Sequence, residues 1–327
     1  MLVGVVGACS SAGVEPAAKP STSTRVRWGD ERRIALSGAP TRFDYQAFDA
    51  ASRTLWIAHL GDDTVERFDV TSETVAATIA DVASPHGVAI GPGGLVYVTA
   101  TGTDEVVAID TATNVIVARA ATGNFPDGVA YDATHNLVLV TNKSDGAITV
   151  HDPRTLELTR TIKLGSETGN VVSDPISGHA FAAVRAPNAL MEFDPTTGAT
   201  IRTIALDGCS GAHGVQLASQ RAYVACEGNA RLIAVDTTSG TVLANDELAD
   251  GPDVLAYDDG RKLLFIAAES SAVDVFDISG STPQHLARRT FIGGAHTIAL
   301  DPSTNRMYLP LAQGTSGPEL LVIEIQV

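Results

Sequence analysis

Apolar residues along most of the chain alternate with polar ones or form short runs, and no segment shows sustained helical spacing. Leu95–Thr99 and Leu137–Asn142 are two such runs, both rich in β-branched residues. Gly, Pro, Asp and Asn separate the runs, as expected for turns between strands. A period of two with frequent Val, Ile and Thr indicates strands. The sequence therefore predicts an all-β protein.

The predicted strands recur with a fixed period. Each repeat holds a turn before a short Val-Ala strand, an apolar strand, an alternating strand ending in Asp, and a Thr-rich hairpin to a fourth strand. The terminal aspartates recur every 41 or 42 residues at Asp69, Asp110, Asp152, Asp194, Asp236 and Asp277. Four strands per repeat of this length are typical of a β-propeller blade. A degenerate copy ending at Glu324 brings the predicted number of blades to seven.

The last blade is predicted to borrow a strand from the start of the domain. The sequence after His296 leaves room for only three strands, at 297–300, 306–310 and 319–326. Residues 33–36 resemble the fourth strand at 202–206 of another repeat. We therefore expect a seven-bladed propeller over 28–327, with an N-terminal strand closing the last blade and removing two open edges.

These repeats resemble the YVTN-repeat propellers. Val98-Thr99, Val140-Thr141-Asn142 and the Asp-x-x-Thr hairpins are close to that consensus, and the resemblance covers about residues 33–327. It implies four-stranded antiparallel blades. It leaves function open, because the group includes binding proteins, surface proteins and a few enzymes.

The N-terminus resembles the end of a bacterial lipoprotein signal. Residues 6–9 read Val-Gly-Ala-Cys, which makes Cys9 the candidate lipidation site and residues 1–9 the residual signal. Only eight residues precede Cys9 and none is basic, whereas signal peptides are usually longer and begin positively charged. Residues 10–27, rich in Ser, Thr, Ala and Pro, fit a tether. We expect a periplasmic or extracellular protein with a lipid anchor as its link to the membrane; an ordinary apolar N-terminus is the alternative.

Charge narrows the range of partners. The chain carries 22 basic and 38 acidic residues, a net charge of -16, which disfavours nucleic acid. Aromatic residues make up only 5%, which argues against a stacking platform for sugars or bases. The expected partners are a small ligand or a protein bound on the top face of a monomer.

One position of the repeat is predicted to form a ring at one mouth of the central channel. It is the residue just before each inner strand, and it reads Asp44, His86, Asp127, Gly169, His213, Asp253 and His296. Three imidazoles alternating with three carboxylates suit one divalent transition metal, such as Zn, Cu, Fe or Ni, and His86 and His296 flank Asp44. The alternative is turn chemistry, since Pro-Asp-Gly and Pro-His-Gly favour turns.

The loops after each second strand are expected to add a second tier on the same face. Its candidate ligand-binding residues are His59, Lys143, Arg185, Glu227 and Glu269. Lys143 and Arg185 could hold an anion, and the glutamates could serve as general acid or base. The alternative is that these side chains simply face water.

Cys209 and Cys226 are predicted to form a disulfide. They lie on the top face of neighbouring predicted strands, and export favours oxidation. Two free thiols, or thiolates joining His213 as ligands, are the alternatives.

The sequence favours a binding module without excluding an enzyme. Motifs such as Gly-x-Ser-x-Gly, a Walker loop or His-Glu-x-x-His do not occur. The leading hypothesis is an extracytoplasmic propeller that binds a metal, a small ligand or a partner protein at the channel mouth. The alternative is a metal-dependent hydrolase, lyase or oxidase at the same place, and the sequence assigns no catalytic residue.

Overall fold

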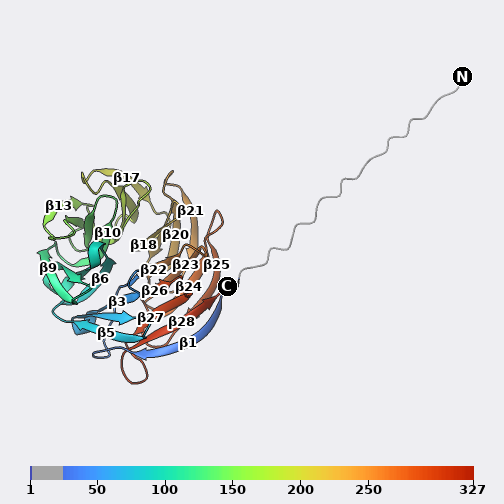
Figure 1. Ribbon diagram of the computed structural model, residues 1–327. Helices are drawn as coiled ribbons and strands as arrows, with labels where there is room; N and C mark the ends of the chain where they lie inside the picture. The colour runs from blue at the N-terminus through green and yellow to red at the C-terminus, as the bar shows by residue number, and fades with distance from the viewer. Residues whose placement is uncertain (2–24) are drawn as a thin grey trace.

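Seven four-stranded antiparallel sheets surround a central channel in the computed structural model, which describes Met1 and residues 25–327 (Figure 1). The seven-bladed all-β architecture predicted from the repeats is confirmed. Within each of the first six sheets the strands follow in chain order from the inside to the outside. No helix in the described part of the chain is long and apolar enough to cross a bilayer.

The strands group by blade. The first two blades contain β2 (Gln46–Asp49), β3 (Thr54–His59), β4 (Thr64–Asp69) and β5 (Thr74–Ile79), then β6 (Pro85–Ile90), β7 (Leu95–Ala100), β8 (Glu105–Asp110) and β9 (Val115–Ala121). The next two contain β10 (Pro126–Asp132), β11 (Leu137–Asn142), β12 (Ala147–His151) and β13 (Leu158–Lys163), then β14 (Thr168–Ser173), β15 (Ala180–Val184), β16 (Ala189–Phe193) and β17 (Thr200–Ala205). The fifth and sixth contain β18 (Ala212–Ala218), β19 (Arg221–Cys226), β20 (Arg231–Asp236) and β21 (Val242–Glu247), then β22 (Pro252–Asp258), β23 (Leu263–Ala268), β24 (Ala272–Asp277) and β25 (Gln284–Thr290). The seventh contains β26 (Ala299–Asp301), β27 (Arg306–Leu311), β28 (Glu319–Gln326) and β1 (Arg27–Ala35). Short 3₁₀ turns lie at η1 (Leu60–Asp62), η2 (Pro92–Gly94) and η3 (Thr101–Thr103).

The core lies between the blades. The second strand of each blade is covered on both faces by its neighbours, and β3, β15 and β23 are buried along their whole length. Burial on both faces explains why these strands read as apolar runs rather than as alternating patterns. The outer strands alternate between exposed and half-buried positions, as in β9.

Thr99 of β7 holds two neighbouring inner strands together at the channel mouth. Thr99 accepts the N–H of Gly87 at 2.7 Å and donates its hydroxyl proton to the carbonyl oxygen of Asp127 at 2.8 Å. The backbones approach so closely that a Cβ on Gly87 would lie 2.5 Å from that same carbonyl oxygen. The backbone at His86 and Asp127 is therefore held together by Thr99 across two neighbouring blades.

The repeating aspartates are turn residues. Asp110 accepts the backbone N–H groups of Ala112 and Thr113 at 3.0 and 2.8 Å. Hydrogen bonds from the Thr113 hydroxyl and backbone lower the pKa of Asp110 below its usual value. These carboxylates start the hairpins between third and fourth strands, which is why they keep the period of the repeat.

The N-terminal strand closes the ring as predicted. β1 pairs antiparallel with β28 from Arg27 opposite Gln326 to Ala35 opposite Glu319, with an irregularity between Trp28 and Glu31. It begins at Arg27, inside the segment assigned to the tether. Cys9 and most of that tether lie outside the described residues, so the lipidation site stays a prediction.

Cys209 and Cys226 form a disulfide, with Cα atoms 5.4 Å apart and a sequence separation of 17. Cys226 ends β19, and Cys209 lies in the loop that leads to His213 in β18. The bond ties that loop to the rigid second strand.

Reducing the disulfide should lower the stability of the fifth blade without altering the strand pairing. For a loop of this length the chain-entropy account gives about 3 kcal/mol. We expect thiol labelling of Cys209 and Cys226 in denatured protein only after reduction, and a lower melting temperature for a Cys209→Ser, Cys226→Ser double variant. Labelling of both cysteines before reduction would contradict the bond.

Candidate functional site

The ring residues lie where the inner strands begin. The register against the second strand shifts at this point in five of the seven inner strands, namely β6, β10, β14, β18 and β22. Irregularities of this kind redirect side chains at sheet edges. Five of the six charged or imidazole members are buried, at 2 to 6% exposed, namely Asp44, Asp127, His213, Asp253 and His296.

The structure brings these side chains into contact across the channel mouth. His213 Nε2 lies 3.3 Å from Asp253 Oδ1 and 3.9 Å from Asp127 Oδ2, although Gly169 separates His213 from Asp127 in the ring. His86 Nε2 lies 3.6 Å from Asp44 Oδ2. The ring is narrow enough for groups on non-adjacent blades to meet.

Three ring members form the most compact donor set. One donor atom each from Asp44, Asp253 and His296 lie within 4.8 Å of one another. In the described part of the chain, Asp44 Oδ1 and His296 Nε2 are buried and have no hydrogen-bond partner. The sequence placed His86 and His296 on either side of Asp44; the compact set contains His296 and Asp253 with Asp44, and His86 Nε2 lies 3.6 Å from Asp44 Oδ2.

Burial and neighbouring charges shift the pKa values of two of the ring carboxylates in opposite directions. Burial, with the nearby charges of Asp253 and Asp127, raises the pKa of Asp44 well above its usual range. Burial also disfavours ionised Asp253, but the hydrogen bond and charge of His213 outweigh it and lower the pKa of Asp253 to about 2. One carboxyl of the pair is therefore firmly ionised while the other resists ionisation.

The three histidines differ in protonation. Burial lowers the pKa of both His86 and His296, and the charge of Arg42 lowers each further. Burial also opposes protonation of His213, but its contacts with Asp253 raise the pKa of His213 above the usual value. His296 Nδ1 lies 3.4 Å from the Gly294 carbonyl oxygen, so this nitrogen is placed to carry the proton and leave Nε2 as an acceptor.

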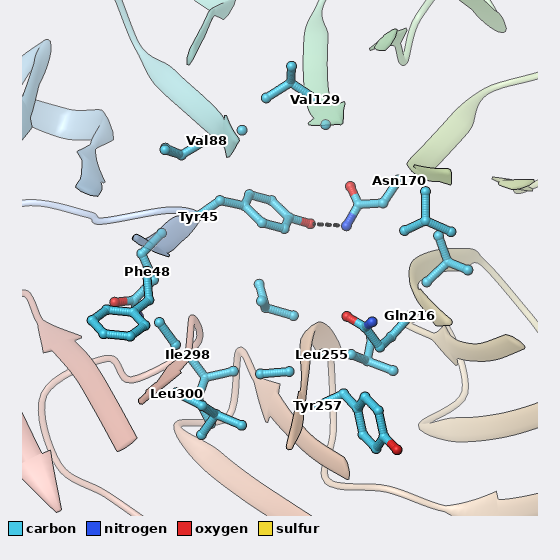
Figure 2. Close-up of a pocket in the computed structure, with 18 of the residues that line it drawn as sticks. Tyr45, Phe48, Val88, Val129, Asn170, Gln216, Leu255, Tyr257, Ile298 and Leu300 are labelled. Carbon is cyan, nitrogen blue, oxygen red and sulfur yellow. Dashed lines mark hydrogen bonds between the residues drawn. The ribbon is translucent and has the colours of Figure 1, made fainter. Parts of the chain in front are cut away.

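Tyr45 forms the floor of the site. Its hydroxyl donates to Asp253 Oδ1 at 3.0 Å and accepts from Asn170 Nδ2 at 2.7 Å, so the side chain crosses the channel (Figure 2). Burial, with the charge of Asp253, raises the pKa of Tyr45 well above its usual value. Below it the channel encloses a cavity of about 420 Å³, lined by aliphatic side chains such as Val88 and Ile298.

The second tier is largely an ion-pair network. Arg42 Nη1 and Nη2 donate to the two carboxylate oxygens of Glu269 at 3.2 and 2.7 Å, and Nη2 also lies 3.8 Å from Asp44 Oδ2. Arg185 pairs with Glu227 and lies 3.5 Å from Glu167. Glu227 and Glu269 are thus partners of arginines.

The other two tier candidates lie differently. Lys143 Nζ is 3.6 Å from Asp127 Oδ2 at the rim of the ring. His59 is fully buried, stacked on Phe43 with ring centroids 4.0 Å apart, and its Nε2 is 3.0 Å from Thr41 Oγ1. The structure therefore places His59 inside the first blade, away from the surface where a ligand would bind.

Sequence reasoning missed Arg42, Tyr45 and Phe125, all next to the ring. Tyr45 carried a usable signal, because it is the aromatic residue at a repeat position where the other blades have Gly87, Gly128, Asn170, Gly214, Val254 and Thr297. Arg42 carried little, because its partner Glu269 lies two blades away.

The repeat sequence matches a known family of propellers. Residues 96–309, well over half of the chain, match the YNCE-like beta-propeller family. The chain belongs to this family. A YVTN-type seven-bladed propeller, as the sequence suggested, fits that membership. The lipoprotein-like N-terminus lies outside the matched residues.

Other comparisons of this YNCE-like propeller are short or distant. It is 47% identical over 53 residues to the PE-PGRS family protein PE_PGRS18 of Mycobacterium tuberculosis (strain ATCC 25618 / H37Rv), a match covering 16% of this chain and 12% of that protein. Kuenenia stuttgartiensis hydrazine synthase superposes with a TM-score of 0.75 at 16% identity, over 95% of this chain and 99% of that one. A chain of the mitotic checkpoint complex gives 0.75 at 12% identity, over 97% and 98%. At these identities the structural likenesses show the fold alone.

Proposed function

We propose that this propeller binds one divalent transition-metal ion at the channel mouth, with Asp44, Asp253 and His296 as the protein ligands. The proposal rests on Asp44 Oδ1 and His296 Nε2, which are buried and have no hydrogen-bond partner among residues 25–327. Buried polar atoms are usually hydrogen-bonded. A carboxylate oxygen and an imidazole nitrogen that both lack such a bond in the described chain are suitable ligands for a cation.

The turn explanation fits these residues less well. A turn-forming aspartate bonds to backbone N–H groups just after it, as Asp110 does. Asp44 Oδ1 and Asp127 Oδ2 lack such bonds among the residues described. Their carboxylates point to something other than the local backbone.

The donor set favours zinc or a similar ion. Donors around a single zinc ion lie roughly 3 to 4 Å apart, so a set already within 4.8 Å needs only small side-chain adjustments. The lowered pKa values of His296 and Asp253 favour the neutral imidazole and the ionised carboxylate that a metal needs, and a bound ion would favour the ionised form of Asp44. His213 and Tyr45, both on Asp253, would orient that ligand.

Three protein ligands would leave part of the coordination sphere of such an ion open. An open position supports binding of a small molecule or a donor group of a partner protein, and this is the role we propose. It is also what a catalytic metal needs, so the enzyme alternative is tested with lactone, ester and thiol substrates. Turnover that depends on the metal and disappears in a His296→Ala variant would favour the enzyme.

Titration calorimetry of chelator-treated protein with Zn, Cu, Ni, Mn and Ca tests the metal site. We expect one ion per chain and a preference for the transition metals. Affinity should fall as the pH is lowered below about 6.5, because protonated imidazole cannot bind a metal. Since burial lowers the pKa of His296, the loss should begin below the pH expected for an exposed histidine. Absence of saturable binding by any of these ions would refute the site.

A further inference from the structure

Phe125 has a backbone conformation that bulky residues avoid. Its φ is +57°, in the left-handed region. It lies two residues before Asp127 in the ring, and the equivalent residues in four other blades include Ser84 and three glycines with positive φ, Gly211, Gly251 and Gly294. At this repeat position, Phe125 is the only large side chain with positive φ in the described chain.

The fold does not need a phenyl ring at this position. The backbone is held by the N–H of Phe125 donating to Asp104 Oδ1 at 2.8 Å and the N–H of Lys143 donating to the Phe125 carbonyl oxygen at 2.9 Å. Ser84 makes the same kind of bond to Asp63 at 2.7 Å in the preceding blade. A glycine could make both bonds without strain. Backbone strain that the fold does not require is often found at functional sites.

The side chain stands exposed at the edge of the ring. Phe125 is 39% exposed, and its ring meets the imidazole of His86 edge-on with centroids 5.4 Å apart. The Lys143 ammonium lies 5.6 Å from the centre of the same ring. Phe125 therefore offers an apolar surface directly beside the channel mouth.

Lys143 differs from the other cations of this face. Arg42 and Arg185 each have a glutamate partner, whereas the ion pair found for Lys143 in the described chain is the one with Asp127. Its side chain is 26% exposed. An ammonium group in this position can donate hydrogen bonds to an anion that binds here.

We propose that Phe125 and Lys143 bind a small organic anion, with an aromatic or flat apolar body, whose carboxylate also reaches the ion in the ring. The body packs on Phe125 and the carboxylate lies beside Lys143. An organic cation is disfavoured, because Lys143 and Arg42 already occupy this side of the ring. The inference rests on the proposed metal site, since without an ion Asp44, Asp127 and Asp253 would repel an anion.

The zinc-loaded full chain is titrated with benzoate, acetate and benzylamine as probes. We expect benzoate to bind about tenfold more tightly than acetate, because only benzoate can pack on Phe125. Benzylamine should not compete. Because coupling between two ligands is reciprocal, benzoate should also tighten zinc binding.

Two variants test the residues. Phe125→Gly should reduce the affinity for benzoate to that for acetate. Lys143→Met should reduce the affinity for both anions about tenfold. Zinc affinity should change by less than about threefold in Phe125→Gly, whose fold is expected to be at least as stable because glycine tolerates positive φ. Lys163→Met, an exposed lysine of β13, and Ile176→Ala, an exposed apolar residue, serve as matched controls.

The outcomes separate the two proposals. Zinc binding without a benzoate preference, or with a preference that survives in Phe125→Gly, would overturn the anion site and leave the metal site intact. Tighter binding of benzylamine than of benzoate would overturn it as well. Absence of zinc binding would end both.

Discussion

A chain that lacks β1, residues 27–35, should lose the cooperative unfolding transition of the propeller. β1 is the fourth strand of the last blade, so its removal leaves β28 with a row of unpaired N–H and C=O groups. We expect a broad, low-temperature transition by circular dichroism and a tendency to associate through the open edge. A control chain beginning at Arg25 keeps β1 whole and should melt as the full chain does.

The expected effect is large because β1 also joins the neighbouring blades. Glu31 pairs with Arg289 at 2.5 Å in the sixth blade, and Arg32 pairs with Glu73 at 2.6 Å in the first. Trp28 packs edge-on against Phe291 with ring centroids 6.1 Å apart. Domains are usually stable by only about 5–15 kcal/mol, so the loss of a whole strand is comparable with the total. A shortened chain with an unchanged transition would show that closure by β1 is dispensable.

Replacing His86, His213 and His296 together by alanine should abolish metal binding and leave the fold intact. These residues lie at the channel mouth and outside the apolar layers between blades, so the strand pairing should be kept, while loss of the buried His213–Asp253 contact should lower the melting temperature. His296→Ala alone should weaken zinc binding at least about 100-fold, the upper end of what a supporting residue costs. His135→Ala is a matched control, since His135 bonds to Asp132 away from the ring. If the triple variant still bound zinc fully, the histidines would not be metal ligands, and the turn explanation of the ring residues would be favoured.

The fold was predictable because each blade is specified locally. The hairpin aspartates, the threonines of the second strands and the glycines after the ring residues each act within one repeat or between adjacent ones. Their period therefore fixed the number of blades and the register of the ring. The disulfide was predictable for the same reason, since Cys209 and Cys226 belong to one blade.

The chemistry of the site was less predictable because it depends on contacts between residues of different blades across the channel. Tyr45 of the first blade contacts Asn170 of the fourth and Asp253 of the sixth. These contacts, together with burial, decide which histidine is neutral and which carboxyl is ionised. A repeat alignment shows that such residues share a ring, but it gives no distances between them. His59 shows the converse, because its repeat position suggested a surface loop while stacking on Phe43 buries it.

Closure by β1 and β28 also sets the order in which the molecule can assemble. Arg33 and Glu319 are 286 residues apart in sequence and are joined at 3.1 Å in the closing sheet. β1 is synthesised long before residues 319–326, so it lacks its partner strand while the residues between them are made. Contacts between such distant residues slow folding. Until β1 and β28 pair, the ring is open, and the free edge of β1 is available for pairing with another chain.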